Sequence, residues 1–305
     1  MKILITGGAG FIGKYLTKYL IENKNEVTIF DNFSNSSKNE MKKELDGVPF
    51  IEGDIRNLEE ILKHLKNYDM VIHLAAKISV TDSIKNPKET FDVNVEGTKN
   101  ILKACDKNDV KKLLVLSSAA VYGNNLILVK TFSENEITNP ISPYGESKLS
   151  MEKSIEQVCH KSDIKGIVLR LFNVYGKGQT EEYAGVITKF AEFIKNNNSL
   201  VIYGDGNQTR DFIAIDDVIK IINNIVNSKF DKSFEIYNIG NGVSTKVIDL
   251  ANIMLKISGK KLKIIFGEKR DGEILHSTAS IDKIKNVFNY ITEIDLKKGI
   301  EKFLN

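Results

Sequence analysis

Cysteine is scarce in this sequence. The 305 residues include only two, Cys105 and Cys159, which lie far apart and belong to no metal-ligand motif. Two isolated thiols exclude a disulfide framework and a cysteine-rich metal site, and they fit a reducing compartment. The four histidines are scattered without ligand spacing, so we expect no bound metal.

Long apolar runs and an excess of charge of one sign are also missing. No stretch is long and apolar enough to span a bilayer, and the first six residues pass straight into a glycine-rich turn without a signal-peptide core. The net charge is only +3, and lysines alternate with glutamates along most helical stretches. We therefore expect a cytoplasmic protein that binds neither a membrane nor nucleic acid.

Arginine is rare as well. Of the 43 basic residues only four are arginine: Arg56, Arg170, Arg210 and Arg270. In a chain that otherwise obtains its positive charge from lysine, these positions are candidates for a planar guanidinium fork that binds a carboxylate or phosphate through two hydrogen bonds.

Short apolar runs alternate with helical patterns through the first half of the chain. Near-continuous apolar strands between helices are typical of a parallel sheet that is covered on both faces. The sequence therefore predicts an α/β fold, a Rossmann-type doubly wound parallel sheet. We expect strands near 3–5, 27–30, 49–51, 70–74, 113–116 and 167–169, and helices near 12–23, 57–66, 84–106 and 144–161.

The second half changes in character, because turn-rich stretches separate its short strands from its helices. This predicts a smaller, mostly C-terminal α/β substrate lobe. We expect residues 1–173 to form the main domain, with residues of about 211–242 returning to it, and residues 174–210 and 243–305 to form the lobe. The polar stretch 32–43 is expected to be a surface loop.

A glycine-rich turn joins the first predicted strand to the first helix. Gly7, Gly10 and Gly13 permit a tight turn and close backbone approach, and the N-terminus of the helix can hold a pyrophosphate. Asp31 ends the second strand, where a carboxylate accepts hydrogen bonds from a ribose and repels a 2′-phosphate. Asp54 ends the third strand, within reach of an adenine edge. This arrangement indicates NAD rather than NADP.

Tyr144 and Lys148 lie four residues apart, which places them on one face of a predicted helix. Ser142 and Pro143 are suited to cap and begin that helix. An ammonium group near the phenol favours the phenolate, so the pair can serve as a general base.

These features occur together in the extended short-chain dehydrogenases/reductases, and the chain most resembles their NAD-dependent nucleotide-sugar epimerases of the UDP-glucose (UDP-galactose) 4-epimerase kind. The resemblance extends nearly end to end. It is carried by residues 7–13, Asp31–Asn32, Gly53–Asp54, His73–Ala76, Asn94, Ser117–Gly123, Tyr144 with Lys148, Arg170–Asn173, Arg210–Phe212 and Arg270–Glu273.

The resemblance implies an isomerase that inverts carbon 4 of a UDP-sugar through a transient 4-keto intermediate. Tyr144 would take the proton of the 4-hydroxyl, Ser118 would hydrogen-bond the same oxygen, and Lys148 would hold the nicotinamide ribose and lower the Tyr144 pKa. The residues implied in NAD binding are Gly7, Gly10, Phe11, Ile12, Gly13, Asp31, Asn32, Asp54, Ile55, Leu74, Ala75, Ala76, Asn94, Tyr144 and Lys148.

The two residues after Ser118 separate this group from its relatives. Sugar-nucleotide 4,6-dehydratases carry an acid and a base where this chain has Ala119 and Ala120, and UDP-glucuronate decarboxylases keep a glutamate at the second position. Methyl groups cannot transfer protons, so dehydration is disfavoured. Another nucleotide-sugar enzyme of the same superfamily, or a non-catalytic NAD sensor, remains an alternative.

By the same resemblance, six further residues complete the substrate site. Ser277 stands where a small residue leaves room for an N-acetyl group, which predicts acceptance of UDP-GlcNAc as well as UDP-glucose. UDP is favoured over dTDP. The resemblance also implies a homodimer that pairs the helices near 84–106 and 144–161. With Ser118 and Tyr144, the expected substrate contacts are Asn173, Tyr203, Arg210, Arg270, Glu273 and Ser277.

Overall fold

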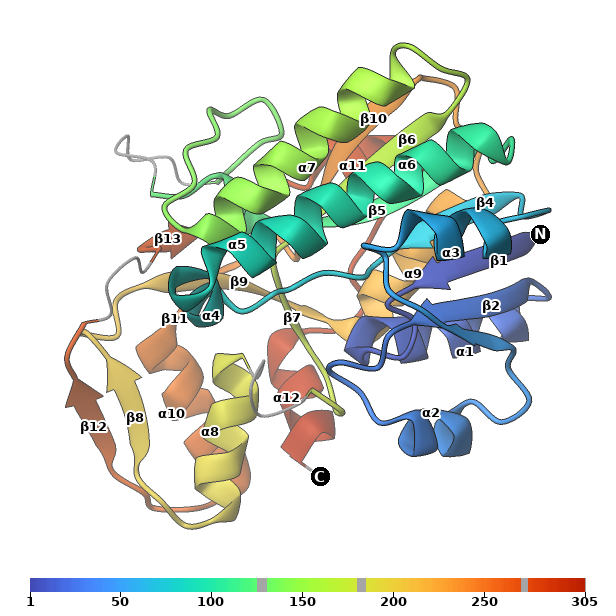
Figure 1. The fold of residues 1–305 in the computed structure, drawn as a ribbon. Helices are drawn as coiled ribbons and strands as arrows, with labels where there is room; N and C mark the ends of the chain where they lie inside the picture. Colours follow the sequence, from blue (N-terminus) through green and yellow to red (C-terminus); the bar gives the residue numbers. More distant parts are fainter. Residues whose placement is uncertain (125–130, 180–184, 270–273, 305) are drawn as a thin grey trace. The chain divides into compact units, whose positions relative to one another are not determined.

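The computed structural model describes residues 1–124, 131–179, 185–269 and 274–304 (Figure 1). Two compact units share the chain. Unit 1 comprises Met1–Val121, Ser142–Arg170 and Ile219–Tyr237, and unit 2 comprises Tyr122–Ile141, Leu171–Val218 and Asn238–Asn305. The division into a main domain and a substrate lobe that the sequence predicts is a functional division, and it stays a prediction.

Unit 1 is built around a seven-stranded sheet with the order β10-β6-β5-β4-β1-β2-β3. The chain crosses between the two halves of this sheet after β3, because β4 returns to the other side of β1. The pairings from β3 through β5 are parallel. The strands are β1 (Lys2–Thr6), β2 (Glu26–Asp31), β3 (Phe50–Glu52), β4 (Met70–His73), β5 (Lys112–Ser118), β6 (Lys165–Leu171) and β10 (Phe234–Ile239).

Helices cover the sheet because its strands are apolar on both sides. Leu4 and Val71 belong to a core cluster with residues of α3, α6 and α7, which pack against one another. Ile3 and Ile5 alternate with Leu4 and are equally buried, so the opposite face is covered too. This confirms the predicted doubly wound fold. The helices of this part are α1 (Phe11–Glu22), α2 (Lys38–Glu44), α3 (Leu58–His64), α4 (Val80–Lys85), α5 (Pro87–Phe91), α6 (Gly97–Lys107), α7 (Pro143–Cys159) and α9 (Ile215–Val226).

Two local predictions were wrong. The helix expected over 84–106 is interrupted: α4 ends at Lys85, Pro87 begins α5, and Asp92–Glu96 form a π-helix before α6. The stretch 32–43 is not all loop, since α2 begins at Lys38. Ser37 caps that helix by accepting the backbone N–H of Glu40, a short-range signal that outweighs the polar composition.

Unit 2 contains a four-stranded sheet in which β9 (Thr209–Ala214) pairs with β7 (Asn173–Tyr175), β11 (Ser244–Lys246) and β13 (His276–Ser277). A separate parallel pair joins β8 (Leu200–Tyr203) to β12 (Ile264–Gly267). Its helices are α8 (Val186–Lys195), α10 (Val247–Ser258), α11 (Asp282–Phe288) and α12 (Leu296–Leu304). Together these form the predicted α/β lobe. Within the described residues, every helix is too short or too polar to cross a bilayer.

Candidate functional site

The loop between β1 and α1 comes too close to its neighbours for side chains. Gly7 has a φ of +70°, and a Cβ there would lie 2.6 Å from the backbone nitrogen of Ala75. A Cβ on Gly13 would lie 2.5 Å from the carbonyl oxygen of Gly7. Gly10, at the N-cap of α1, has no side chain that could cap the helix, so the first-turn N–H groups stay available to an anion. Phe11 and Ile12 follow in that first turn.

Asp31, at the carboxyl end of β2, holds this loop in place. Its carboxylate accepts the backbone N–H of Ala9 (3.0 Å) and of Phe33 (2.8 Å). Burial raises the pKa of Asp31, and these two hydrogen bonds oppose the rise. A carboxylate has about four acceptor sites, so two remain for ribose hydroxyls.

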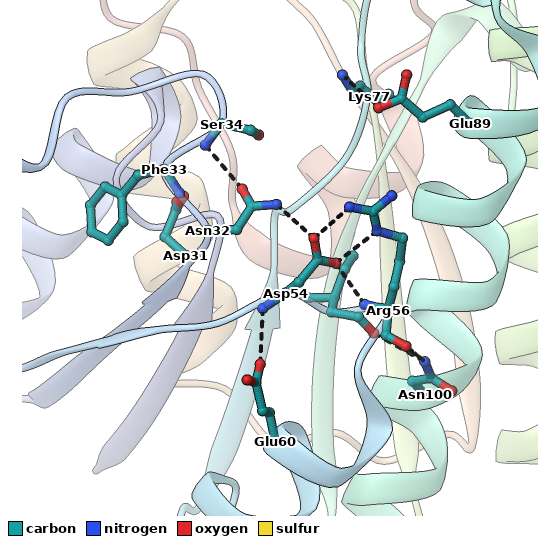
Figure 2. A network of polar contacts seen from close by, with 11 residues as sticks. Asp31, Asn32, Phe33, Ser34, Asp54, Arg56, Glu60, Lys77, Glu89 and Asn100 are labelled. Atoms are coloured by element: carbon teal, nitrogen blue, oxygen red, sulfur yellow. Dashed lines mark hydrogen bonds and ion pairs between the residues drawn. The ribbon is translucent and has the colours of Figure 1, made fainter.

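Asp54 lies at the centre of a polar network beyond β3 (Figure 2). The guanidinium of Arg56 binds its two oxygens at 3.0 and 2.7 Å, and the amide of Asn32 donates to one of them at 2.9 Å. These contacts lower the pKa of Asp54 to about 2, the Arg56 hydrogen bond most of all. Asn100 of α6 donates to the carbonyls of Ile55 and Arg56 and so fixes this turn. One rare arginine therefore forms the expected fork.

Asn94 sits inside the π-helix and ties three segments together. Its amide oxygen accepts the N–H of Lys77 (2.8 Å), and its amide nitrogen donates to the carbonyl of Lys77 and to the hydroxyl of Ser147, both at 2.9 Å. The first two bonds fix the loop after β4, which contains Leu74, Ala75 and Ala76. The third reaches α7 next to Lys148.

Tyr144, Lys148 and Ser118 are brought together at the end of β5 and the start of α7. Burial raises the pKa of Tyr144, and a hydrogen bond with Ser118 lowers it in part. The ammonium of Lys148 donates to the carbonyl of Leu116 at 2.9 Å. Burial lowers the pKa of Lys148 to about 8, while the charge of Glu152 opposes the change. A buried phenol, a hydroxyl and an easily deprotonated ammonium therefore share one site.

The N-terminus of α7 is fixed on two sides. The Ser142 hydroxyl accepts the N–H of Gly145 (3.2 Å), as the sequence predicted, and Pro143 stands in the first turn. The N–H of Tyr144 is bound instead by the Ser83 hydroxyl of α4 (3.1 Å). Ser83 was missed because its contact spans 61 residues and no local pattern marks it.

His73, at the end of β4, is held between two threonine hydroxyls. Its ring nitrogens contact the hydroxyls of Thr6 (2.6 Å) and Thr98 (3.0 Å), and Thr98 donates to the carbonyl of Asn94 (2.6 Å). Since the Thr98 proton is committed to that carbonyl, Nε2 of His73 must be the donor and Nδ1 the acceptor. Burial and the charge of Lys148 lower the pKa of His73 to about 3.

Three of the expected substrate residues share one sheet in unit 2. Arg210 on β9 is the register partner of Ser277 on β13. Asn173 on β7 is the register partner of Phe212 on the same strand β9, and its amide donates to the carbonyl of Asp211. Tyr203, at the end of β8, is 40 % exposed. Arg270 and Glu273 lie outside the described residues. The roles of all these residues stay predictions.

The residues of unit 1 fit a bound dinucleotide. The glycine loop makes the close backbone approach that side chains would prevent, α1 offers uncapped N–H groups, and Asp31 presents a carboxylate at the end of the next strand. These are the properties that pyrophosphate and ribose recognition require.

Comparison with known proteins points the same way. The model of the NAD dependent epimerase/dehydratase family matches residues 3–240. A putative UDP-glucose 4-epimerase of Methanocaldococcus jannaschii is 40% identical over 99% of this chain and 97% of its own.

Solved structures are similar over the whole chain. The UDP-glucose 4-epimerase of Thermotoga maritima with UDP-glucose superposes with a TM-score of 0.91 at 32% identity, covering 100% of this chain and 97% of that one. A UDP-N-acetylglucosamine 4-epimerase of Methanobrevibacter ruminantium, in complex with UDP-N-acetylmuramic acid, gives 0.91 at 32%, covering 99% and 96%. With the fold, the glycine loop and the Ser118–Tyr144–Lys148 site in place, the chain belongs to the NAD-dependent epimerase/dehydratase family, as an isomerase of the epimerase type whose cofactor is NAD.

Proposed function

We propose that this enzyme is a UDP-sugar 4-epimerase that interconverts UDP-glucose with UDP-galactose and UDP-GlcNAc with UDP-GalNAc. The observation that carries the proposal is the hydrogen bond between Ser118 and the buried Tyr144, together with the two alanines, Ala119 and Ala120, that follow Ser118 in the chain. The site has a group that moves the proton of a sugar hydroxyl, but at these two positions it lacks an acid or base for eliminating water.

The residues of the chain divide the work as follows. Tyr144 takes the proton of the 4-hydroxyl, and Ser118 hydrogen-bonds the same oxygen while its charge develops. Lys148, as an ammonium, favours the phenolate of Tyr144. Held by the glycine loop, Asp31 and Lys148, NAD would supply the hydride transfer to and from carbon 4 that an inversion through a 4-keto sugar requires.

The cofactor would be held by the residues that the sequence singled out. The loop of Gly7, Gly10 and Gly13 and the first turn of α1 would bind the pyrophosphate, Asp31 the adenosine ribose, and Lys148 the nicotinamide ribose. Asn32, Asp54 and Ile55 would border the adenine, and Leu74, Ala75, Ala76 and Asn94 would line the loop after β4.

The diphosphate and uridine would be bound by residues of unit 2. Arg210 offers the guanidinium fork that suits a diphosphate, and Asn173 lies beside its strand. Tyr203 presents an exposed ring for stacking on uracil. For Arg270 and Glu273, roles at the diphosphate and the uridine ribose rest on sequence resemblance alone.

Proton NMR of the purified protein with UDP-glucose, then with UDP-GlcNAc, tests this function. With NAD supplied and no other reductant, the C4 epimer should accumulate to a fixed ratio without net NADH. Tyr144→Phe should lower kcat about 10²–10⁴-fold, because a general base is lost, while NAD binding persists. Binding without turnover of either sugar would contradict the proposal and direct the search to other nucleotide sugars or to a non-catalytic role.

Ser277 supports the wider substrate range. Its side chain is small and buried, 5 % exposed, opposite Arg210. Ser277→Tyr should abolish turnover of UDP-GlcNAc and preserve that of UDP-glucose, since the larger ring occupies the space of the N-acetyl group. If the wild type converts UDP-glucose but forms no UDP-GalNAc, the N-acetyl part of the proposal fails.

We further propose a homodimer. Val80 and Ile84 of α4 are large apolar side chains that are 39 % and 55 % exposed, and α4 packs against α5 and α7, the region expected to pair. Burying such a patch against a second copy is the usual way in which exposed apolar surface is stabilised.

A further inference from the structure

Two buried charges lie one helical turn beyond the catalytic lysine. Glu152 of α7 and Arg170 of β6 are 2 % and 4 % exposed. The guanidinium grips the carboxylate from two nitrogens, Nη2 at 2.7 Å and Nε at 3.1 Å. The hydroxyl of Ser117 donates to the same carboxylate at 2.5 Å. This cluster of Ser117, Glu152 and Arg170, the Glu152 triad, has no part in the proposed chemistry.

The triad continues the catalytic arrangement in a regular way. Tyr144, Lys148 and Glu152 follow one another at intervals of four residues on the buried face of α7. Lys148 binds the carbonyl of Leu116, and Glu152 binds the side chain of Ser117, the next residue of β5. The residue after that is Ser118. Two charged anchors thus set the register of α7 against the strand end that carries the catalytic hydroxyl.

Stability alone does not account for such a pair. Removing two charges from water costs several kcal/mol per ion, and replacing a buried ion pair by apolar residues of similar volume is often neutral or stabilising. A buried carboxylate does, however, exert a strong field on an ammonium one turn away, because the surroundings screen it poorly.

We propose that the Glu152 triad is a positioning device for the catalytic site: it holds Lys148 in the charged form and Ser118 in reach of Tyr144. The inference rests on the proposed function, which requires an ammonium beside the phenol. The carboxylate of Glu152 is paired with the guanidinium of Arg170 from β6. His73 on β4 also faces Lys148 but is neutral near neutral pH, since its pKa is about 3. Glu152 is therefore the negative group that keeps the proton on Lys148, whose pKa its charge raises.

The double variant E152Q/R170M tests the proposal without leaving a lone buried charge. Glutamine retains an acceptor for the hydroxyl of Ser117, and methionine is an uncharged, unbranched side chain that fills much of the space of the arginine. The variant removes the positive charge of Arg170 together with the negative charge of Glu152, but Glu152 is the charge that raises the pKa of Lys148. Lys148 should therefore lose its proton at lower pH. The alkaline limb of the kcat profile should shift down by about one pH unit or more, with about a tenfold loss at pH values above the new limb and an unchanged KM for the sugar nucleotide.

Two single variants sharpen the comparison. Glu156→Gln removes the same charge from the same helix one turn further on, where the side chain is exposed, and should leave the profile unchanged. Ser117→Ala removes only the hydroxyl that joins Glu152 to β5. It should lower kcat several-fold and shift the alkaline limb of the kcat profile less than E152Q/R170M does.

A second readout does not depend on turnover. The phenolate absorbance of the NAD-loaded protein, less that of Tyr144→Phe, reports the ionisation of Tyr144 among the ten tyrosines. In E152Q/R170M this ionisation should move to higher pH, and this result supports the triad even if neither sugar is epimerised. If both the titration and the kcat profile match the wild type and only Tm changes, the triad is structural and the inference is overturned, whereas the epimerase assignment stands.

Discussion

Lys148 carries its charge inside the protein at a cost in stability. Burial lowers its pKa from 10.5 to about 8. Between these values the unfolded chain still holds the proton that the folded chain has lost, so stability should rise with pH across this window. The difference corresponds to about 3 kcal/mol.

Lys148→Met should therefore be more stable than the wild type near neutral pH without added NAD, and the proposed function predicts that it is inactive. The difference in the free energy of unfolding between the variant and the wild type should shrink by about 3 kcal/mol between pH 8 and 10.5, because lysine titrates in this range and methionine does not. Urea unfolding at several pH values measures it. Lys153→Met, an exposed change on the same helix, is the matched control. Parallel stability curves for Lys148→Met and the wild type would show that burial does not shift this lysine.

His73 provides a pH prediction of the same sign in the acid range. Its folded pKa of about 3 lies below the usual 6.5, so its contribution is fully present above pH 6.5 and is lost as pH falls toward 3. Nitrogen NMR at pH 5 should show one neutral ring with the proton on Nε2. The signal is assigned by its absence in His73→Gln. An imidazolium at that pH would contradict the Thr6–His73–Thr98 geometry.

At the scale of single residues, the sequence could predict placement where a motif is local. The glycine loop and Asp31 lie at the strand ends where they were expected, and Tyr144 and Lys148 share the buried face of α7, whereas the roles of these residues stay predictions. Glu152 could have been noticed, since it continues the same helix face, and Arg170 was already marked by the rarity of arginine. What could not be predicted was that the two meet, because that contact depends on how α7 lies on β5 and β6.

At the scale of elements, the break in the α4–α6 region brings several buried hydrogen bonds to one residue. Asn94 in the π-helix makes three hydrogen bonds to Lys77 and Ser147. A π-turn inserts an extra residue and so turns one side chain out of the helical register. Pro87 is a local signal for the break between α4 and α5, but the prediction of a single helix followed the apolar periodicity instead. The π-helix at Asp92–Glu96 leaves no comparable signal in the sequence.

Asn94→Ala should weaken NAD binding, because the loop at Leu74–Lys77 loses both of its side-chain hydrogen bonds to Asn94. The expected loss of stability is on the order of 3 kcal/mol, since buried partners stay unsatisfied. Calorimetric NAD titration and thermal unfolding measure the two effects. Asn108→Ala, at the C-cap of α6, should leave NAD affinity unchanged. Equal losses of affinity in both variants would refute a specific role for Asn94.

The shortest strands of unit 2 could not be predicted from the sequence. Strand β13 has two residues and β7 and β11 have three each, so no periodicity can identify them. They are strands only because β9 pairs with them. The first six strands of the seven-stranded sheet were predictable because they are nearly continuous apolar runs.

At the scale of the whole molecule, the proposed homodimer gives a direct test. Light scattering should report about twice the chain mass of 34.2 kDa. Ile84→Glu places a charge in the exposed apolar patch of α4 and should yield the monomer. Ile137→Glu, at a side chain that is 74 % exposed in unit 2, should remain dimeric. A wild-type monomer at working concentrations would contradict the dimer.

The central place of β1 in its sheet also has a consequence for synthesis. Strand β1 is flanked by β2 on one side and by β4 on the other, although β4 follows it by more than sixty residues in the chain. A nascent chain can pair β1 with β2 and β2 with β3, but the opposite edge of β1 stays open until residues 70–73 have emerged. The far edge is complete only with β10, at residues 234–239. The β1-β2-β3 half of the sheet can therefore assemble during translation before the half that carries Ser118. A ribosome that stalls between these points exposes one unpaired edge of β1.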